Sequence, residues 1–125
     1  MRFEDRLKAL GARYSIVALY VFGSRTRESD VDIAVQPAVG RRLAAEERVR
    51  LAQEFEDLLG AERIDLIVLP EADPFLALDV VRGELLYCAD PDAQAEEELY
   101  VLRRAADLAP YAQERWRLIL SGTTP

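Results

Sequence analysis

Hydrophobic and polar residues follow two different periods along this 125-residue chain. The apolar runs YSIVALYVF and IDLIVL, rich in β-branched and aromatic residues, are typical of buried strands, whereas apolar residues three and four positions apart are typical of helices that face a core. The patterns predict helices over 3–10, 40–59, 74–81 and 92–120, and strands over 14–22, 31–35, 64–69 and 84–88, the last a short edge strand. We therefore expect an α/β fold with helices packed on a mixed β-sheet, in which the first two strands form a hairpin-like pair and a helical tail follows.

Glycine and proline mark where the predicted helices begin and end. Gly11, Gly60 and Gly83 follow helical patterns directly and are predicted to stop them, because glycine readily takes the backbone conformations found just past a helix. Asp73 is followed by a proline, a pair typical of an N-cap and the first helical position. Pro110 lies inside the last helical pattern and predicts a kink or a new helix there. The apolar stripe of that pattern contains Leu99, Leu102, Ala106 and Ala109.

Composition excludes several classes of protein. The net charge is −7, from 16 basic and 23 acidic residues, so direct nucleic-acid binding is not expected. The absence of histidine excludes Ser-His-Asp and Cys-His nucleophiles and nearly all zinc sites. No apolar run approaches the roughly 20 residues of a membrane span, there is no signal-peptide pattern and Cys88 is the single cysteine, so we expect a cytoplasmic protein that does not enter the membrane.

A chain of this size is expected to fold as one domain. We place that domain over 1–120, with 91–120 as its C-terminal helical segment, and predict that the tail 121–125 is disordered.

Three acidic residues carry the candidate chemistry. Asp30 and Asp32 stand two apart at the start of a predicted strand, so both carboxylates project from one face. Carboxylates about 4 Å apart repel by about 4 kcal/mol at an effective dielectric constant of 20. Asp65 lies within an apolar strand, where an unpaired carboxylate is costly and calls for a metal ion or an arginine. A hard cation such as Mg²⁺ or Mn²⁺ fits such a cluster, although Asp-Val-Asp taken alone is also compatible with a polar strand entry.

The turn before these acids is suited to binding phosphate. Gly23 allows backbone N–H groups to approach an anion, and the hydroxyl of Ser24 adds a hydrogen bond. Arg25 and Arg27 follow, and they either neutralise a leaving pyrophosphate or belong to a solvated loop.

The Gly-Ser turn, the Asp-x-Asp strand and the later strand acid resemble the minimal, MNT-type nucleotidyltransferases of the DNA polymerase β-like superfamily. The resemblance covers most of the chain and implies a small nucleotidyltransferase fold. It also implies that two divalent ions, Mg²⁺ with Mn²⁺ as an alternative, bind to acids that are also the catalytic residues. By matching motif, the metal-binding and catalytic residues are Asp30, Asp32 and Asp65, and the nucleotide-binding residues are Gly23, Ser24, Arg25 and Arg27.

The segments LRR at 102–104 and DLAP at 107–110 are similar to the tail of MntA-type antitoxins. That similarity implies transfer of AMP from ATP to a tyrosine hydroxyl of a HepT-type toxin, with Asp65 as the best candidate to accept the hydroxyl proton. Little of the chain follows the core, so we expect the acceptor to come from another protein.

Two alternatives stay open from the sequence. One is nucleotidyl transfer to a small molecule such as an aminoglycoside, with an oligomer completing the pocket. The other is an antitoxin that acts by binding alone. The second follows from the loop RTRES, which is shorter than is common in the family and has Glu28 where a glycine usually stands.

Overall fold

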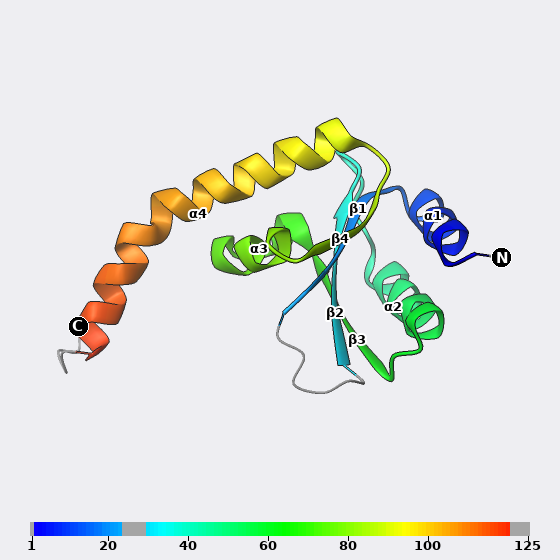
Figure 1. The fold of residues 1–125 in the computed structure, drawn as a ribbon, viewed down its shortest axis with the longest axis horizontal. Coiled ribbons are helices and arrows are strands. Elements are labelled where there is room, and N and C mark those ends of the chain that lie inside the picture. Colours follow the sequence, from blue (N-terminus) through cyan, green and yellow to red (C-terminus); the bar gives the residue numbers. More distant parts are fainter. Residues whose placement is uncertain (1, 24–29, 121–125) are drawn as a thin grey trace.

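The fold is a four-stranded mixed sheet with helices on both faces. The computed structural model describes residues 2–23 and 30–120, with side chains except those of Asp30, Trp116 and residues 118–120. The helices are α1 (Phe3–Arg13), α2 (Ala45–Leu59), α3 (Pro74–Val81) and α4 (Pro91–Leu120), and a short 3₁₀ turn, η1, covers Leu69–Glu71. The strands are β1 (Ile16–Phe22), β2 (Asp30–Pro37), β3 (Arg63–Val68) and β4 (Glu84–Cys88). The predicted fold class is confirmed (Figure 1).

The strand order across the sheet is β3-β2-β1-β4, so β4 is an edge strand as predicted. β1 pairs antiparallel with β2, which confirms the hairpin-like pair, and also with β4. β2 and β3 pair in parallel, a connection that needs a crossover, and α2 supplies it. All seven residues of β1 are buried because this strand lies inside the sheet and is covered on both faces.

Two hydrophobic clusters hold the layers together. α1 and α2 cover one face of the sheet, where Leu19, Ile33 and Phe55 are fully buried. α3 and the first part of α4 cover the other face, where Tyr20 and Val80 are buried (Figure 1). From Ala18 to Phe22 the side chains of β1 alternate between the two clusters, as the period of two in a strand requires, whereas Val17 lies on the same side as Ala18 where the register with β2 shifts.

The α1 helix is longer than predicted. It continues through Gly11 to Arg13, so the prediction that Gly11 ends it is wrong. A Cβ atom at Gly11 would lie 2.4 Å from the ring of Tyr87. This glycine therefore permits close packing of the helix against β4.

Other boundaries differ in smaller ways. α2 begins at Ala45, later than predicted, and Gly60 ends it in a left-handed conformation as predicted. The Asp73 carboxylate accepts hydrogen bonds from two backbone N–H groups at the start of α3, which confirms the predicted N-cap. β3 is less buried than its apolar sequence predicts, because it is the edge strand opposite β4 and only Ile64 and Val68 are buried.

The last helix is continuous through Pro110, so no new helix begins there. A proline cannot donate a backbone hydrogen bond to the preceding turn, and Figure 1 shows the axis of α4 turning downward in its C-terminal part. The predicted tail 121–125 lies outside the described residues. In the part of the chain that the structure describes, no helix has the length and hydropathy needed to cross a membrane.

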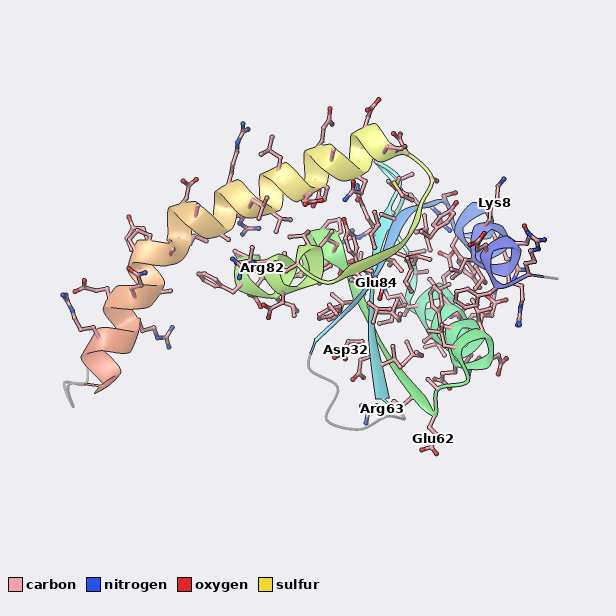
Figure 2. The ribbon with its side chains drawn as sticks, in the orientation of Figure 1. Lys8, Asp32, Glu62, Arg63, Arg82 and Glu84 are labelled. Atoms are coloured by element: carbon pink, nitrogen blue, oxygen red, sulfur yellow. The ribbon has the colours of Figure 1, made fainter. Side chains whose placement is uncertain are left out.

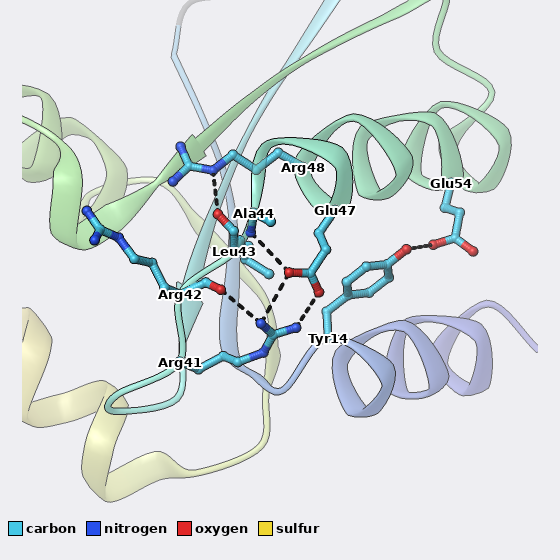
Figure 3. Close-up of polar contacts among 8 residues, drawn as sticks. All are labelled: Tyr14, Arg41, Arg42, Leu43, Ala44, Glu47, Arg48 and Glu54. Atoms are coloured by element: carbon cyan, nitrogen blue, oxygen red, sulfur yellow. Dashed lines mark hydrogen bonds and ion pairs between the residues drawn. The ribbon is translucent and has the colours of Figure 1, made fainter.

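The start of α2 is held by a polar network shown in Figure 3. One Glu47 oxygen accepts hydrogen bonds from the Ala44 N–H at 3.0 Å and from the Arg41 guanidinium at 3.2 Å, and the other oxygen pairs with the same guanidinium. The hydrogen bonds from Arg41, followed by the bond from Ala44, lower the pKa of the Glu47 carboxyl from 4.5 to about 2.

We predict that Glu47 shapes the acid stability of the fold. Because its folded-state pKa is lowered, the stabilising effect of its charge is complete above about pH 4.5 and is lost as the pH falls toward 2. Glu47→Gln should therefore lower the urea midpoint at neutral pH and flatten its decline between those pH values. Glu46→Gln, which changes an exposed acid in the same turn, is the control and should follow the wild-type curve. A Glu47→Gln curve parallel to wild type would contradict the prediction.

Candidate active site

The candidate site lies at the end of the sheet where β1 finishes and the other strands begin. Phe22 on β1 is the register partner of Asp32 on β2, and Asp32 is the register partner of Asp65 on β3. Figure 2 shows Asp32 at this end, below α3. Parallel strand neighbours are about 4.8 Å apart, so the fold brings together two acids that lie far apart in the chain.

Strand alternation places both acids on one face of the sheet. Ile33 on β2 and Ile64 on β3 belong to the cluster under α1 and α2. Ala34 belongs to the opposite cluster, and Ile67 packs against it. Asp32 and Asp65 stand two positions from Ala34 and Ile67, so they lie on the face covered by α3.

Gly23 forms the wall next to Asp32. Its φ is +85°, and a Cβ atom there would lie 2.5 Å from Oδ2 of Asp32. Only glycine allows the backbone turn and the Asp32 carboxylate to come this close. The expected nucleotide-binding residues Ser24, Arg25 and Arg27, and the loop residue Glu28, lie outside the described residues. Asp30 is described by its backbone, which begins β2 opposite Arg63.

Asp65 is not buried, contrary to the expectation for an acid in an apolar strand. Its side chain is 52% exposed because β3 is an edge strand, and Oδ1 lies 3.5 Å from Nε of Arg63. An exposed pair of this kind stabilises the fold by at most about 1 kcal/mol. Its importance is positional, because the pair puts a guanidinium beside the candidate acids. Sequence reasoning missed Arg63, although an arginine two positions before a strand acid shares its face.

A cleft of about 530 Å³ opens beside Gly23. The end of β1 forms one wall, and Asp79 on α3 contributes a polar group. Arg82 in the turn after α3 and Glu84 at the start of β4 contribute two more (Figure 2). The turn between α3 and β4 approaches closely, since a Cβ atom at Gly83 would lie 2.4 Å from the carbonyl oxygen of Val21. Gly83 thus follows α3 as predicted, and it also permits this contact. The sequence carried no signal that Arg82 and Glu84 border the site, because only the sheet pairing brings them there.

The donor chemistry fits a hard divalent cation. Among the described side chains, no group of three or more histidine, cysteine or acidic residues could hold a metal ion, and Asp30 is not among those side chains. Magnesium is commonly held by one or two carboxylates, with substrate phosphates completing its shell. Asp32 and Asp65, brought together on one face, meet that requirement.

The fold and this site define a nucleotidyltransferase. Residues 5–92 match the family model described as Polymerase beta, Nucleotidyltransferase, and the chain therefore belongs to that family. Members of this family typically use divalent metal ions. No curated protein matches the sequence.

Solved structures of toxin–antitoxin proteins share the fold over nearly the whole chain. A chain in the structure of a toxin–antitoxin with AMP-PNP is 25% identical with a TM-score of 0.75, covering 94% of this chain and 98% of that chain. A chain in the structure of a tri-AMPylated Shewanella oneidensis HEPN toxin with MNT antitoxin is 25% identical with a TM-score of 0.74, and the match covers 94% of this chain and 96% of that chain. A chain in a MntA–HepT toxin–antitoxin structure is 27% identical with a TM-score of 0.67, and the match covers 95% of each chain. The resemblance to MntA-type minimal nucleotidyltransferases is confirmed.

We predict that Gly23→Ala disrupts the site specifically. Gly40 has nearly the same φ, +80°, and a Cβ atom there would have no neighbour within 4 Å, so Gly40→Ala is a matched control. Both variants should lose about 1–2 kcal/mol of stability, because alanine is strained in the left-handed region. Only Gly23→Ala should also displace the Asp32 carboxylate and weaken Mg²⁺-dependent ATP binding, measured by isothermal titration calorimetry. Equal ATP affinities in the two variants would contradict the role of Gly23.

Proposed function

We propose that this protein is an antitoxin that transfers AMP from ATP to a hydroxyl group of a HepT-type HEPN toxin, and that this hydroxyl belongs to a tyrosine. The observation that carries the proposal is the register of Asp32 opposite Asp65, with Gly23 against the Asp32 carboxylate. The family match supports nucleotidyl transfer. The similar chains in structures with AMP-PNP and with an AMPylated HEPN toxin support the nucleotide and the class of acceptor.

The strand-end acids are assigned to the metal ions of this reaction. Two Mg²⁺ ions, or Mn²⁺ as an alternative, would be held by Asp30, Asp32 and Asp65. Bound divalent ions offset phosphate charge and lower the pKa of a nearby hydroxyl. The start of β2 puts Asp30 two positions before Asp32, the spacing at which strand residues share a face.

The turn after β1 is assigned to the triphosphate. The Gly23 backbone lies close to the Asp32 carboxylate, so a phosphate bound by this turn would lie beside the acids. Ser24, Arg25 and Arg27 would complete the phosphate contacts, and the two guanidinium groups would neutralise the leaving pyrophosphate.

The reaction is an in-line displacement at the α-phosphorus of ATP. The acceptor oxygen forms a bond to phosphorus, the bond to the bridging oxygen of the β-phosphate breaks, and pyrophosphate leaves with that electron pair. The hydroxyl proton passes to the Asp65 carboxylate. The half-exposed position of Asp65 on an edge strand supports this role, because a side chain from another protein can reach it.

We predict transfer of label to a protein from ATP labelled at the α-phosphate and not from ATP labelled at the γ-phosphate. The purified protein, Mg²⁺ and lysate of the source organism should give a discrete labelled band, whose identity names the acceptor. Asp32→Asn should abolish the label, because it removes the carboxylate that lies against Gly23 on the strand next to Asp65.

Other outcomes of this labelling experiment would select the alternatives. Label from the α-phosphate on a soluble small molecule would mean an acceptor other than a protein. An absence of label from either position, with a protein partner still captured from the lysate, would mean that the antitoxin acts by binding alone.

We further predict that Asp65→Asn separates nucleotide binding from transfer. Loss of the proton acceptor should reduce the transfer rate by about 10²–10⁴-fold, while ATP affinity stays within a few-fold of wild type. Glu62→Gln is the control, because Glu62 is a neighbouring exposed acid just before β3 and should leave both quantities unchanged (Figure 2). Retained turnover in Asp65→Asn would overturn the assignment of Asp65.

A further inference from the structure

The long helix α4 has two apolar faces, and the body of the protein covers only one. On the inner face Val101 and Ala105 are buried against the sheet and α3. Gln94 strengthens this contact by donating a hydrogen bond of 2.7 Å to the hydroxyl of Tyr20 on β1. The inner face is therefore the one that fastens α4 to the domain.

The outer face carries the apolar stripe read from the sequence. Successive spacings of four, three, four and three are those of the a and d positions of a heptad repeat. Leu99 and Leu102 are 47% and 41% exposed, although they form the centre of this stripe. We call this set the outer seam; its described members are Ala95, Leu99, Leu102, Ala106 and Ala109.

The seam lies beside a shallow groove and a pair of opposite charges. Glu96 and Arg103 are seven positions apart, flank the seam on the same side, and are exposed. Together with Leu99 and Tyr100 they line an open groove along the helix. A heptad seam flanked by charges at the e position is the arrangement that sets partner and orientation in paired helices.

We propose that the outer seam pairs with the outer seam of a second copy of this chain, in an antiparallel arrangement. When Leu99 is placed opposite the partner subunit's Leu102, the twofold axis places Leu102 opposite the partner subunit's Leu99. The same register places Ala95 opposite the partner subunit's Ala106. Leucines therefore meet leucines at the centre and alanines flank them, while Ala109 at the end of the seam lies opposite the partner subunit's Asp92, an exposed acid in the first turn of α4.

The flanking charges select the second copy as the occupant. In this register Glu96 lies beside the partner subunit's Arg103, and Arg103 lies beside the partner subunit's Glu96. The seam is thus self-complementary in shape and in charge, as a twofold interface requires. A parallel pairing would instead bring Arg103 beside the partner subunit's Glu98, because positions e and g then face each other. The Glu98 carboxylate already accepts a hydrogen bond of 2.8 Å from the Gln94 amide on the inner face, and Glu96 would have no basic partner, so the charges favour the antiparallel register.

The pairing leaves the active site open. α4 begins after Cys88, the register partner of Ala18 near the start of β1, whereas Gly23 follows the far end of that strand. Figure 1 accordingly shows the first turns of α4 at the opposite end of the sheet from the strand-end acids. Formation of the proposed dimer therefore does not depend on the proposed catalytic activity.

The test is sedimentation equilibrium of the full chain over a wide range of concentration. Wild type should show a concentration-dependent monomer–dimer equilibrium. The dimer should be weak, because the seam has only five members on one helix of each subunit and so buries little surface. Glu96→Arg and Arg103→Glu should each weaken dimerisation roughly tenfold or more, because each replaces two attractive pairs by two repulsive ones. Glu46→Arg, the same charge change at an exposed position of α2, should leave the equilibrium unchanged.

Mixing the two variants gives the sharper result. Glu96→Arg has two arginines at these positions and Arg103→Glu has two glutamates, so an equimolar mixture should form a heterodimer that neither variant forms with itself. The double variant should likewise dimerise as wild type does. Circular dichroism of each variant checks that the helix content is unchanged.

Three results would overturn the proposal: a wild type that stays monomeric at the highest concentrations, single variants that dimerise as wild type does, or a mixture that does not restore the dimer. If the wild type is monomeric and the single variants no longer capture the toxin, the outer seam contacts a helix of the toxin and not a second copy of this chain.

Discussion

The parallel pairing of β2 with β3 is the constraint on which the candidate site depends. A shift of one residue in this register would move Asp65 to the face under α1 and α2 and separate it from Asp32. The register is held because Ile33 and Ile64 must enter the core on that face. Hydrophobic burial on one side of the sheet therefore positions the carboxylates on the other.

The position of each strand in the sheet explains how accessible each part of the site is. β1 lies inside the sheet with all its residues buried, and it delivers Gly23 as a rigid end point beside Asp32. β3 lies at the edge, so Asp65 is half exposed and reachable from solvent. A glycine turn at the end of a buried strand, next to an accessible acid, suits the proposed transfer to another protein.

Particular residues show how far sequence reasoning reached. Local signals were sufficient for the Asp73 N-cap, the Gly60 helix end and the strand with its glycine turn, because each depends on neighbouring residues along the chain. Gly11 does not end its helix as the local pattern predicts, since its role is a contact with Tyr87 on a distant strand. Asp65 is half exposed where its apolar strand predicts burial, because an apolar strand in the sequence does not reveal whether it will be central or at an edge.

The sequence by itself determined the strand and helix types, the candidate acids and the chemistry that those acids can perform. These properties follow from residue types and from periods of two and 3.6, which act over a few positions. Only the tertiary structure decided that Asp32 and Asp65 are neighbours, that Arg63 pairs with Asp65, and that Arg82 and Glu84 border a cleft beside Gly23. It also decided which of the two apolar faces of α4 is buried against the sheet and α3. Those outcomes depend on strand order and close packing between segments far apart in the chain, and no local pattern carries that information.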